Sequence, residues 1–387
     1  MDLSNQLNHF AASMQPSEIL TFNQNISQIP DLIKLTLGEP DFNTPDHIKA
    51  AAIKAIKDNH SHYANPQGIL PLRKAAAKFL KDKYRLHYDP KSQIQVTTGV
   101  SQGIHSVFEA ILNPGDEVII PTPIFPFYIP NVIQNGGKPV FINVSHDNYI
   151  LTPQKLEATL KQHPKTKALV MNFPNNPVGN TYTRDQLIGL GKVIKQHHIF
   201  CVSDEIYSEL TYDHPHISMG NIVPDQAIVM NGVSKTFAMT GYRIGIVCGP
   251  AKVIQAVSNM SCIATTAAAT PIQFAAAEAF QNGEDDGVKM RKIYKQRRDI
   301  LRNGLAKAGF TSPEPSGAFY IFAKIPNQFT QDSLKFAYQL AKKAHVGVIP
   351  GNAFGPGGEG HLRISYAAST NDIKRAVRRI QKFVKEN

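Results

Sequence analysis

Three segments of the chain read KALVMNFPNNPVG (residues 167–179), IFCVSDEIY (199–207) and AIVMNGVSKTF (227–237). Each begins with a short apolar run and ends in a polar loop, which is typical of a buried strand in a parallel sheet. Ligands bind beyond the carboxyl ends of the strands in such sheets. We therefore expect the polar residues that end these segments to converge on one site: Asn176, Asp204, Tyr207 and Lys235.

The flanking sequence continues the same alternation of β-branched runs and helical patterns, which predicts an α/β fold with a mainly parallel sheet. Further strands are predicted over 93–98, 117–121 and 139–144, and helices over 46–58, 71–84 and 101–112. After about residue 282 the pattern changes to a long basic helix, strand-like segments and a terminal helix. We predict a large domain over 46–282, a smaller α+β domain over 283–387, and an irregular N-terminal segment, 1–45, that joins the smaller domain.

The composition is that of an ordinary globular protein, with 42% hydrophobic and 18% charged residues. No run approaches the roughly 20 apolar residues of a membrane span, and the first residues do not resemble a secretory signal. The three cysteines form no CxxC pair, which favours reduced thiols over a disulfide or a metal site. We therefore expect a cytoplasmic protein with no membrane association and no metal.

The formal net charge is +11, and basic residues gather in two stretches, 289–302 and 374–385. Both stretches are predicted to be amphipathic helices, whose basic faces are most often simply solvated. The sequence has no recognisable signature of a nucleic-acid-binding fold. We expect no nucleic-acid partner, although a basic protein attracts anionic small molecules.

Lys235 is of interest because of its neighbours, since a lysine in a loop is by default a solvated residue. Asp204 ends an apolar strand, where an unpaired carboxylate is costly and needs a cationic partner. Tyr207 follows three residues later and would project close to Asp204 if a helical turn starts there. Taken by itself, Asp204 is explained as a residue that caps a helix. Taken by itself, Tyr207 is explained as an ordinary core residue. Their combination with Lys235 favours a functional site.

The string SKTFAMTGYRIG (234–245) resembles the lysine signature of the class I aminotransferases, pyridoxal-phosphate-dependent enzymes of fold type I. Other strings match the family in the same order: LTLGEPDF (35–42), YANPQGILPLR (63–73), TTGVSQGI (97–104), NPGDEVIIPTPIFPFY (113–128), NFPNNPVG (172–179), VSDEIYSELTY (202–212), PSGAFYIF (315–322) and LRISYA (362–367). The resemblance implies a mainly parallel seven-stranded sheet between helices, a smaller α+β domain, and pyridoxal 5'-phosphate as cofactor. Within the family it is strongest toward aromatic and broad-specificity bacterial enzymes.

The resemblance also implies a role for each residue at the strand ends. Lys235 is similar to the lysine that holds the cofactor as a Schiff base and carries the proton. Asp204 would pair with the pyridine nitrogen, because an anion keeps that nitrogen protonated and the protonated ring is a strong electron sink. Tyr207 and Asn176 would donate hydrogen bonds to the phenolate oxygen of the ring.

Other matches imply a phosphate site and a stacking partner. Gly99, Val100 and Ser101 precede a predicted helix, so their backbone amides can face an anion. Ser234 would add a hydroxyl group and Arg243 a charged hydrogen bond. Phe125 is similar to the aromatic residue that stacks on the ring, although tyrosine or tryptophan is common there. Tyr63 is similar to the tyrosine that reaches the phosphate from a second subunit, which implies a homodimer with a shared active site.

For the substrate, Arg363 is similar to the arginine that binds the α-carboxylate, and a planar guanidinium suits a planar carboxylate. Gly38 would add a backbone amide to the same carboxylate site. The resemblance also implies that Asn176 contacts the substrate. The resemblance implies that aspartate-selective relatives contact the second carboxylate of the substrate with a lysine and a threonine. This chain has Ser101 in place of the lysine and Ile19 in place of the threonine. Both residues here are neutral, which predicts an aromatic or other apolar amino acid as the donor and 2-oxoglutarate as the acceptor.

Other functions remain open. Related enzymes act on aspartate or on N-acetyl-diaminopimelate, whose amino-acid part is the same. A carbon–sulfur lyase would use the same cofactor and lysine, but the TGYRIG string favours amino transfer. A regulatory sensor domain of similar fold would carry an N-terminal DNA-binding module, and only about 30 residues precede the family match, too few for one.

Overall fold

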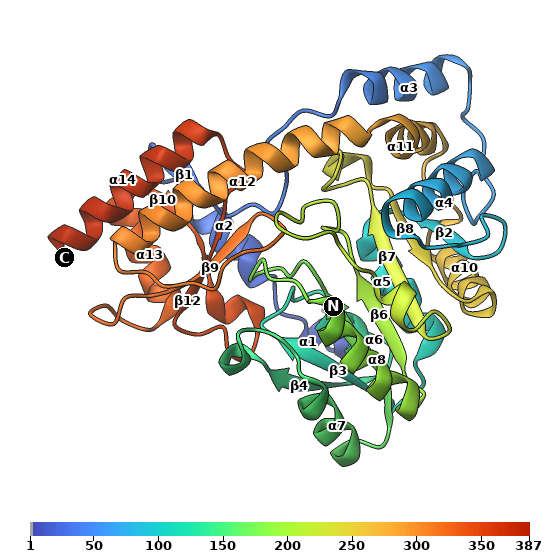
Figure 1. The fold of residues 1–387 in the computed structure, drawn as a ribbon, viewed down its shortest axis with the longest axis horizontal. Coiled ribbons are helices and arrows are strands. Elements are labelled where there is room, and N and C mark those ends of the chain that lie inside the picture. Colours follow the sequence, from blue (N-terminus) through green and yellow to red (C-terminus); the bar gives the residue numbers. More distant parts are fainter. Residues whose placement is uncertain (1–2) are drawn as a thin grey trace.

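The computed structural model, which describes residues 3–387, is built around a seven-stranded sheet (Figure 1). The strand order is β2-β8-β7-β6-β5-β3-β4. The strands are β2 (Ile94–Thr97), β3 (Glu117–Thr122), β4 (Lys138–Asn143), β5 (Thr166–Asn172), β6 (Phe200–Asp204), β7 (Ala227–Gly232) and β8 (Gly245–Cys248). Every pairing is parallel except the two that β8 makes with its neighbours. The predicted α/β class with a mainly parallel seven-stranded sheet is therefore confirmed.

The central strands are covered on both faces, which explains why they appear in the sequence as continuous apolar runs. Ala168 and Val170 of β5 pack into a core with α5 (Gly99–Ile111), α6 (Tyr128–Gln134) and α10 (Ala251–Thr265). Leu169 and Met171 of the same strand point the other way, into a core with α7 (Pro153–Gln162) and α8 (Arg184–His197). A third core joins β2 and β8 to α3 (Asp46–Lys57), α4 (Leu70–Tyr84) and α11 (Thr270–Asn282).

A further hydrophobic core is built mainly from the C-terminal quarter of the chain, to the left of the large sheet in Figure 1. Its helices are α12 (Glu284–Lys307), α13 (Ser333–Ala344) and α14 (Thr370–Glu386). They pack with a three-stranded antiparallel sheet of β11 (Ile349–Pro350), β12 (His361–Ser365) and β9 (Tyr320–Lys324). Ile206 and Tyr207 also belong to this core, so it meets the large sheet where β6 ends. The division into domains at residues 45 and 282 stays a prediction.

The N-terminal segment is only partly irregular over residues 3–45, so that expectation is wrong in part. It contains α1 (His9–Ser13), α2 (Glu18–Ile26) and β1 (Ile33–Lys34), and β1 pairs in parallel with β10 (Val346–Gly347). Ser17 caps α2 through its hydroxyl oxygen, which accepts a hydrogen bond from the Leu20 amide. Phe22 and Ile26 on the buried side of α2 complete the C-terminal core. The helix is short, so tertiary burial supplies most of its stability.

One strand of the large sheet and the start of one helix that packs on it also differ from the prediction. Gly245–Cys248 forms β8, although no strand is predicted there. Helix α5 begins at Gly99 and not at residue 101. Gly99, Val100 and Ser101 therefore form the first turn of the helix and do not precede it. Among residues 3–387, no helix is both long enough and apolar enough to cross a membrane.

His47 on α3 connects that helix to α11 and also to α12, a helix of the C-terminal core. Its Nδ1 lies 2.8 Å from Glu278 Oε1 on α11, and its Nε2 lies 2.8 Å from Asp286 Oδ2 on α12. Both ring nitrogens donate only in the imidazolium form. Burial by itself lowers the pKa of His47, but the hydrogen bonds to Asp286 and Glu278 outweigh burial and raise it. The protonated form is therefore the one that holds α3 against α11 and α12.

We expect the stability that His47 provides to be present below its unfolded pKa of about 6.5 and to fall as pH rises through the higher folded value. The site is partly open to solvent, so protonated His47 should add about 0.5–1 kcal/mol to the free energy of unfolding at pH 6. Thermal melts of the wild type and of His47→Gln at pH 6 and pH 9 measure it. The difference between the two proteins should shrink at the higher pH, whereas His198→Gln, an exposed control, should show no such change. An equal difference at both pH values would contradict this prediction.

Candidate active site

A cavity lies where the carboxyl ends of β5, β6 and β7 meet the C-terminal core. Twelve of the fourteen predicted site residues line it: Ile19, Gly38, Val100, Ser101, Phe125, Asn176, Asp204, Tyr207, Ser234, Lys235, Arg243 and Arg363. The exceptions are Gly99, at the start of α5, and Tyr63, which lies in the connection between α3 and α4 and is 89% exposed. The strand ends therefore converge as the sequence predicts, and elements from both ends of the chain complete the walls.

The register of the sheet places the polar strand ends side by side. Asn172, the last residue of β5, is the partner of Asp204, the last residue of β6. The loop after β5 is tied to this edge, because the Asn176 amide donates a hydrogen bond to Asn172 Oδ1 at 2.9 Å. Lys235 follows three residues after the end of β7. Three neighbouring strands thus present an amide, a carboxyl group and an amine to one cavity.

Asp204 is buried, and its carboxyl group accepts two hydrogen bonds. One comes from Tyr128 Oη at 2.6 Å and the other from the Ile206 amide at 3.1 Å. Burial raises the pKa of Asp204 to about 6, although these two hydrogen bonds oppose the change. Within residues 3–387, no lysine, arginine or histidine forms an ion pair with it. Since a carboxylate has about four lone-pair sites, Asp204 can still accept from a cation in the cavity, such as a protonated ring nitrogen.

The Lys235 amine lines the same cavity as Arg243, the residue that is expected to bind the phosphate. Its Nζ donates a hydrogen bond to the Gly38 carbonyl at 2.6 Å. Burial is the main cause that lowers the pKa of Lys235 to about 8; the charges of Arg243 and Arg363 act in the same direction, and those of Glu39 and Asp204 oppose them. A substantial share of this amine is therefore neutral near pH 8, as a nucleophile or proton acceptor requires.

Arg243 and the first turn of α5 form a site suited to an anion. A Cβ at Gly99, whose φ is +72°, would lie 2.4 Å from Arg243 Nη2, so only glycine allows the guanidinium so close to the helix. Arg243 Nη1 donates to the Thr240 carbonyl at 2.9 Å, and within residues 3–387 no carboxylate pairs with Arg243. Ser234 lines the same cavity. Helix amides, a hydroxyl group and a guanidinium are the donors that a phosphate group prefers.

Arg363 on β12 is a buried cation held from two sides. Nη1 donates to Asn176 Oδ1 at 3.0 Å and Nη2 donates to the Thr36 carbonyl at 2.6 Å. The guanidinium carbon lies 4.7 Å from the centre of the Tyr320 ring. Burial lowers the pKa of Arg363, and its Nε has no partner within residues 3–387. A buried guanidinium with a free donor and no paired acid fits a substrate carboxylate.

Two tyrosines at the site were not identified from the sequence. Tyr128 donates to Asp204, and the Tyr320 hydroxyl lies 2.8 Å from the Tyr207 hydroxyl, where either can be the donor. Tyr128 follows Phe125 by three residues within a string that already matches the family. Tyr320 also explains Gly38, because a Cβ at residue 38 would lie 2.5 Å from its hydroxyl oxygen. No spacing in the sequence reveals either contact.

The rest of the cavity wall is largely apolar. It is formed by Ile19 and Leu20 of α2, Leu37, Val100, Ile104 and Phe125. Ser101 lies on the same wall. The cations that line the cavity are Lys235, Arg243 and Arg363, and residues 3–387 place no fourth lysine or arginine there. One chain therefore provides no cation at Ser101 or Ile19 for a second carboxylate of a substrate.

Comparison with known proteins gives consistent matches along nearly the whole chain. Residues 30–380 match the family model described as aminotransferase class I and II. The chain is 41% identical over 378 residues to a probable N-acetyl-LL-diaminopimelate aminotransferase of Bacillus subtilis, covering 98% of this chain and 95% of that protein. It is 38% identical over 379 residues to aromatic-amino-acid aminotransferase 2 of Thermococcus litoralis, covering 96% and 97%. The structure of aspartate aminotransferase from Thermus thermophilus with maleate has a TM-score of 0.92 at 37% identity, covering 97% and 99%.

Proposed function

Because the chain belongs to the class I and II aminotransferase family and is a pyridoxal-phosphate-dependent aminotransferase, we propose that its donor is an aromatic or other apolar L-amino acid. The acceptor in this proposal is 2-oxoglutarate, and the two half-reactions alternate at one site. The observation that carries the proposal is the apolar wall of Ile19, Leu37 and Phe125, with the neutral Ser101 beside it. The relatives act on different amino acids by name, so their names do not decide the donor.

Bound pyridoxal phosphate supplies an aldehyde and a ring that accepts electrons from the substrate α-carbon. In the proposal, Lys235 is the amine that carries the cofactor and then moves the proton at its Nζ. A pKa of about 8 suits this task, because a general base works best when its pKa is close to the working pH. The Gly38 carbonyl, 2.6 Å away, holds the amine in place.

Other residues of the chain position the cofactor. Asp204 would accept a hydrogen bond from the ring nitrogen, and the hydrogen bond from Tyr128 limits the movement of its carboxyl group. The first turn of α5, with Val100 and Ser101, would bind the phosphate together with Ser234 and Arg243. Phe125 would stack on the ring. Tyr207 and Asn176 would donate hydrogen bonds to the ring oxygen.

The substrate is held at its α-carboxylate by Arg363. Asn176 and the Thr36 carbonyl fix the plane of the guanidinium, and Gly38 adds its backbone amide. A fixed carboxylate orients the α-carbon so that the correct bond faces Lys235. The side chain of the substrate then extends toward Ile19 and Ser101. These two residues set the preference for an apolar side chain.

We expect phenylalanine and tyrosine to have a kcat/KM at least about tenfold higher than aspartate, because burying a second carboxylate without a partner is costly. A panel of L-amino acids with 2-oxoglutarate as acceptor measures this preference. Ser101→Lys should raise the aspartate-to-phenylalanine ratio by about tenfold through one new charged contact. Ser101→Gln, similar in length but neutral, should not. A wild-type preference for aspartate or for N-acetyl-LL-diaminopimelate would refute the proposed donor.

The proposed homodimer accounts for Tyr63, which is highly exposed in one chain and would reach the phosphate of the other subunit. We expect Tyr63→Phe to weaken pyridoxal phosphate binding by about tenfold, the cost of one hydrogen bond to a charged group. Equilibrium dialysis measures the affinity, and analytical ultracentrifugation checks that the variant keeps the mass of the wild type. Unchanged affinity in a dimer of normal mass would exclude the role of Tyr63, and a monomeric wild type would exclude the shared site.

A further inference from the structure

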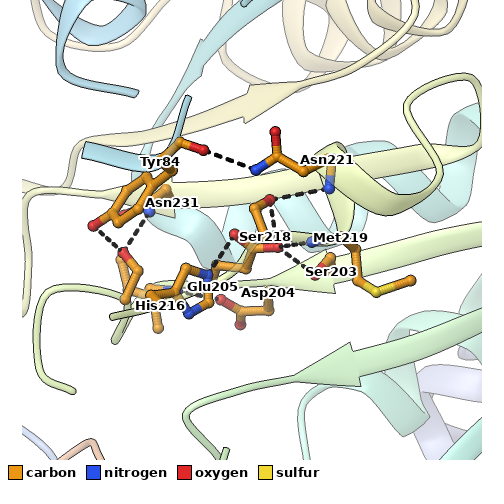
Figure 2. A network of polar contacts seen from close by, with 12 residues as sticks. Tyr84, Ser203, Asp204, Glu205, His216, Ser218, Met219, Asn221 and Asn231 are labelled. Atoms are coloured by element: carbon orange, nitrogen blue, oxygen red, sulfur yellow. Dashed lines mark hydrogen bonds and ion pairs between the residues drawn. The ribbon is translucent and has the colours of Figure 1, made fainter. Parts of the chain in front are cut away.

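Glu205 lies directly after Asp204, but its side chain belongs to a polar network outside the cavity wall. Figure 2 shows Glu205 within this network, with Asp204 beside it. Its Oε1 accepts hydrogen bonds from Ser203 Oγ at 2.7 Å, Ser218 Oγ at 2.9 Å and the Met219 amide at 3.1 Å. Its Oε2 lies 2.8 Å from His216 Nε2, and both side chains are fully buried. The carboxyl group thus has four donors and no contact with solvent.

These contacts indicate that Glu205 is ionised and that His216 is neutral. Hydroxyl and amide donors on a carboxyl group favour its charged form. His216 Nδ1 has no partner within residues 3–387. An imidazolium would leave a buried N–H donor unpaired there, which is costly, whereas a neutral ring with its proton on Nε2 leaves only a lone pair. The network therefore holds a net negative charge in the interior.

That charge is next to the carboxyl group proposed to bind the ring nitrogen. The groups that act on Asp204 are Tyr128, the Ile206 amide, Lys235, Tyr207 and Glu205. Besides Asp204, the charge of Glu205 raises the pKa of Tyr84, Tyr88, Cys201 and Cys248, which burial also keeps in their neutral forms. In the described part of the chain, residues 3–387, no lysine or arginine forms an ion pair with Glu205, and its ion-pair partner is His216.

We propose that Glu205 is a positioning residue whose buried negative charge strengthens the hold of Asp204 on the protonated ring nitrogen of pyridoxal phosphate. A like charge makes Asp204 harder to ionise and a better acceptor for a shared proton. Burial and the charge of Glu205 both raise the pKa of Asp204. The inference rests on the role of Asp204 proposed above.

Glu205→Gln tests the proposal, because it removes the charge and keeps the shape and an acceptor oxygen. In cofactor-free protein with ¹³C-labelled aspartate carboxyl groups, the titration midpoint of Asp204 should fall by about one pH unit, assigned with Asp204→Asn. The affinity for pyridoxal phosphate should fall about tenfold. An analogue with C–H in place of the ring nitrogen should bind wild type and variant equally. Equal weakening of both compounds would show a merely structural role and overturn the proposal.

Glu209→Gln is the matched control. Glu209 is a buried carboxylate four residues later, but it accepts from Tyr84 Oη at 2.7 Å and lies 3.8 Å from Lys83 Nζ, which compensates its charge. This variant should leave both readouts unchanged. If Asp204→Asn keeps full affinity, the proposed role of Asp204 is wrong. If Asp204→Asn weakens binding and Glu205→Gln does not, the inference about Glu205 is wrong.

A second measurement avoids dependence on the folding of Glu205→Gln. Isotope-edited infrared spectra of the wild type report whether the Glu205 carboxyl group is ionised at neutral pH, and a protonated group would overturn the proposal. His216→Gln keeps the charge of Glu205 and can still donate a hydrogen bond to it. We expect this variant to retain the wild-type affinity for pyridoxal phosphate within about twofold. A tenfold loss would assign the effect to His216 and contradict the proposal.

Discussion

Lys235→Ala is expected to lower kcat for amino transfer from phenylalanine to 2-oxoglutarate by at least about 10³-fold. Two contributions are lost together, the amine that carries the cofactor and the group that moves the proton, and general acid–base catalysis alone contributes about 10²–10⁴-fold. No other lysine lines the cavity within residues 3–387, so no neighbour can replace it. Steady-state kinetics measures the loss, and the visible spectrum of the purified protein reports whether the cofactor is still attached through a lysine.

Two variants separate the loss of the amine from the loss of charge. Lys235→Arg keeps a positive charge near the Gly38 carbonyl but has no amine that deprotonates at working pH, so it should be as inactive as Lys235→Ala. Lys324→Ala removes an exposed lysine on β9 and should keep full activity. If Lys235→Ala retains more than about a tenth of the wild-type kcat and the wild-type spectrum, Lys235 is not the catalytic lysine.

The convergence of the strand ends was predictable because it depends on local patterns. The apolar runs that end in Asn172, Asp204 and Gly232 are buried on both faces of the sheet, and parallel strands bring their carboxyl ends to one edge. The family strings then assigned roles to individual residues. The role of Arg363 could be predicted only from that resemblance. A single arginine on a predicted strand is equally consistent with a solvent-exposed side chain at the edge of a sheet.

What the sequence did not reveal depends on contacts between distant segments. The Tyr128–Asp204 hydrogen bond spans 76 residues and the Tyr207–Tyr320 contact spans 113. Strand β1 has only two residues, and its partner is β10 near the other end of the chain. Such short elements have too few residues for a period of two to be visible. Their positions follow from tertiary packing, which no local pattern encodes.

Arg363→Lys is expected to lower kcat/KM for phenylalanine by about 10²–10³-fold, corresponding to about 3–4 kcal/mol. In the wild type, Asn176 Oδ1 and the Thr36 carbonyl each bind one terminal nitrogen, so the planar fork has a fixed orientation. An ammonium group is a point charge and cannot keep both contacts and present two parallel donors to a carboxylate. Stopped-flow measurement of the first half-reaction, over a range of phenylalanine concentrations, separates weaker binding from slower chemistry.

The specificity of this effect can be tested against an arginine outside the site. Arg375 on α14 is partly exposed and pairs with Asp31 and Asp372 at 3.0 Å, so Arg375→Lys should change kcat/KM by less than about twofold. Arg363→Lys should also keep the affinity for pyridoxal phosphate, because Arg243 and α5 bind the phosphate in our proposal. Loss of both substrate and cofactor binding would point to a disturbed fold. A change of less than about threefold in kcat/KM would exclude Arg363 as the carboxylate-binding residue, because losing a bidentate contact in a buried site costs more than that.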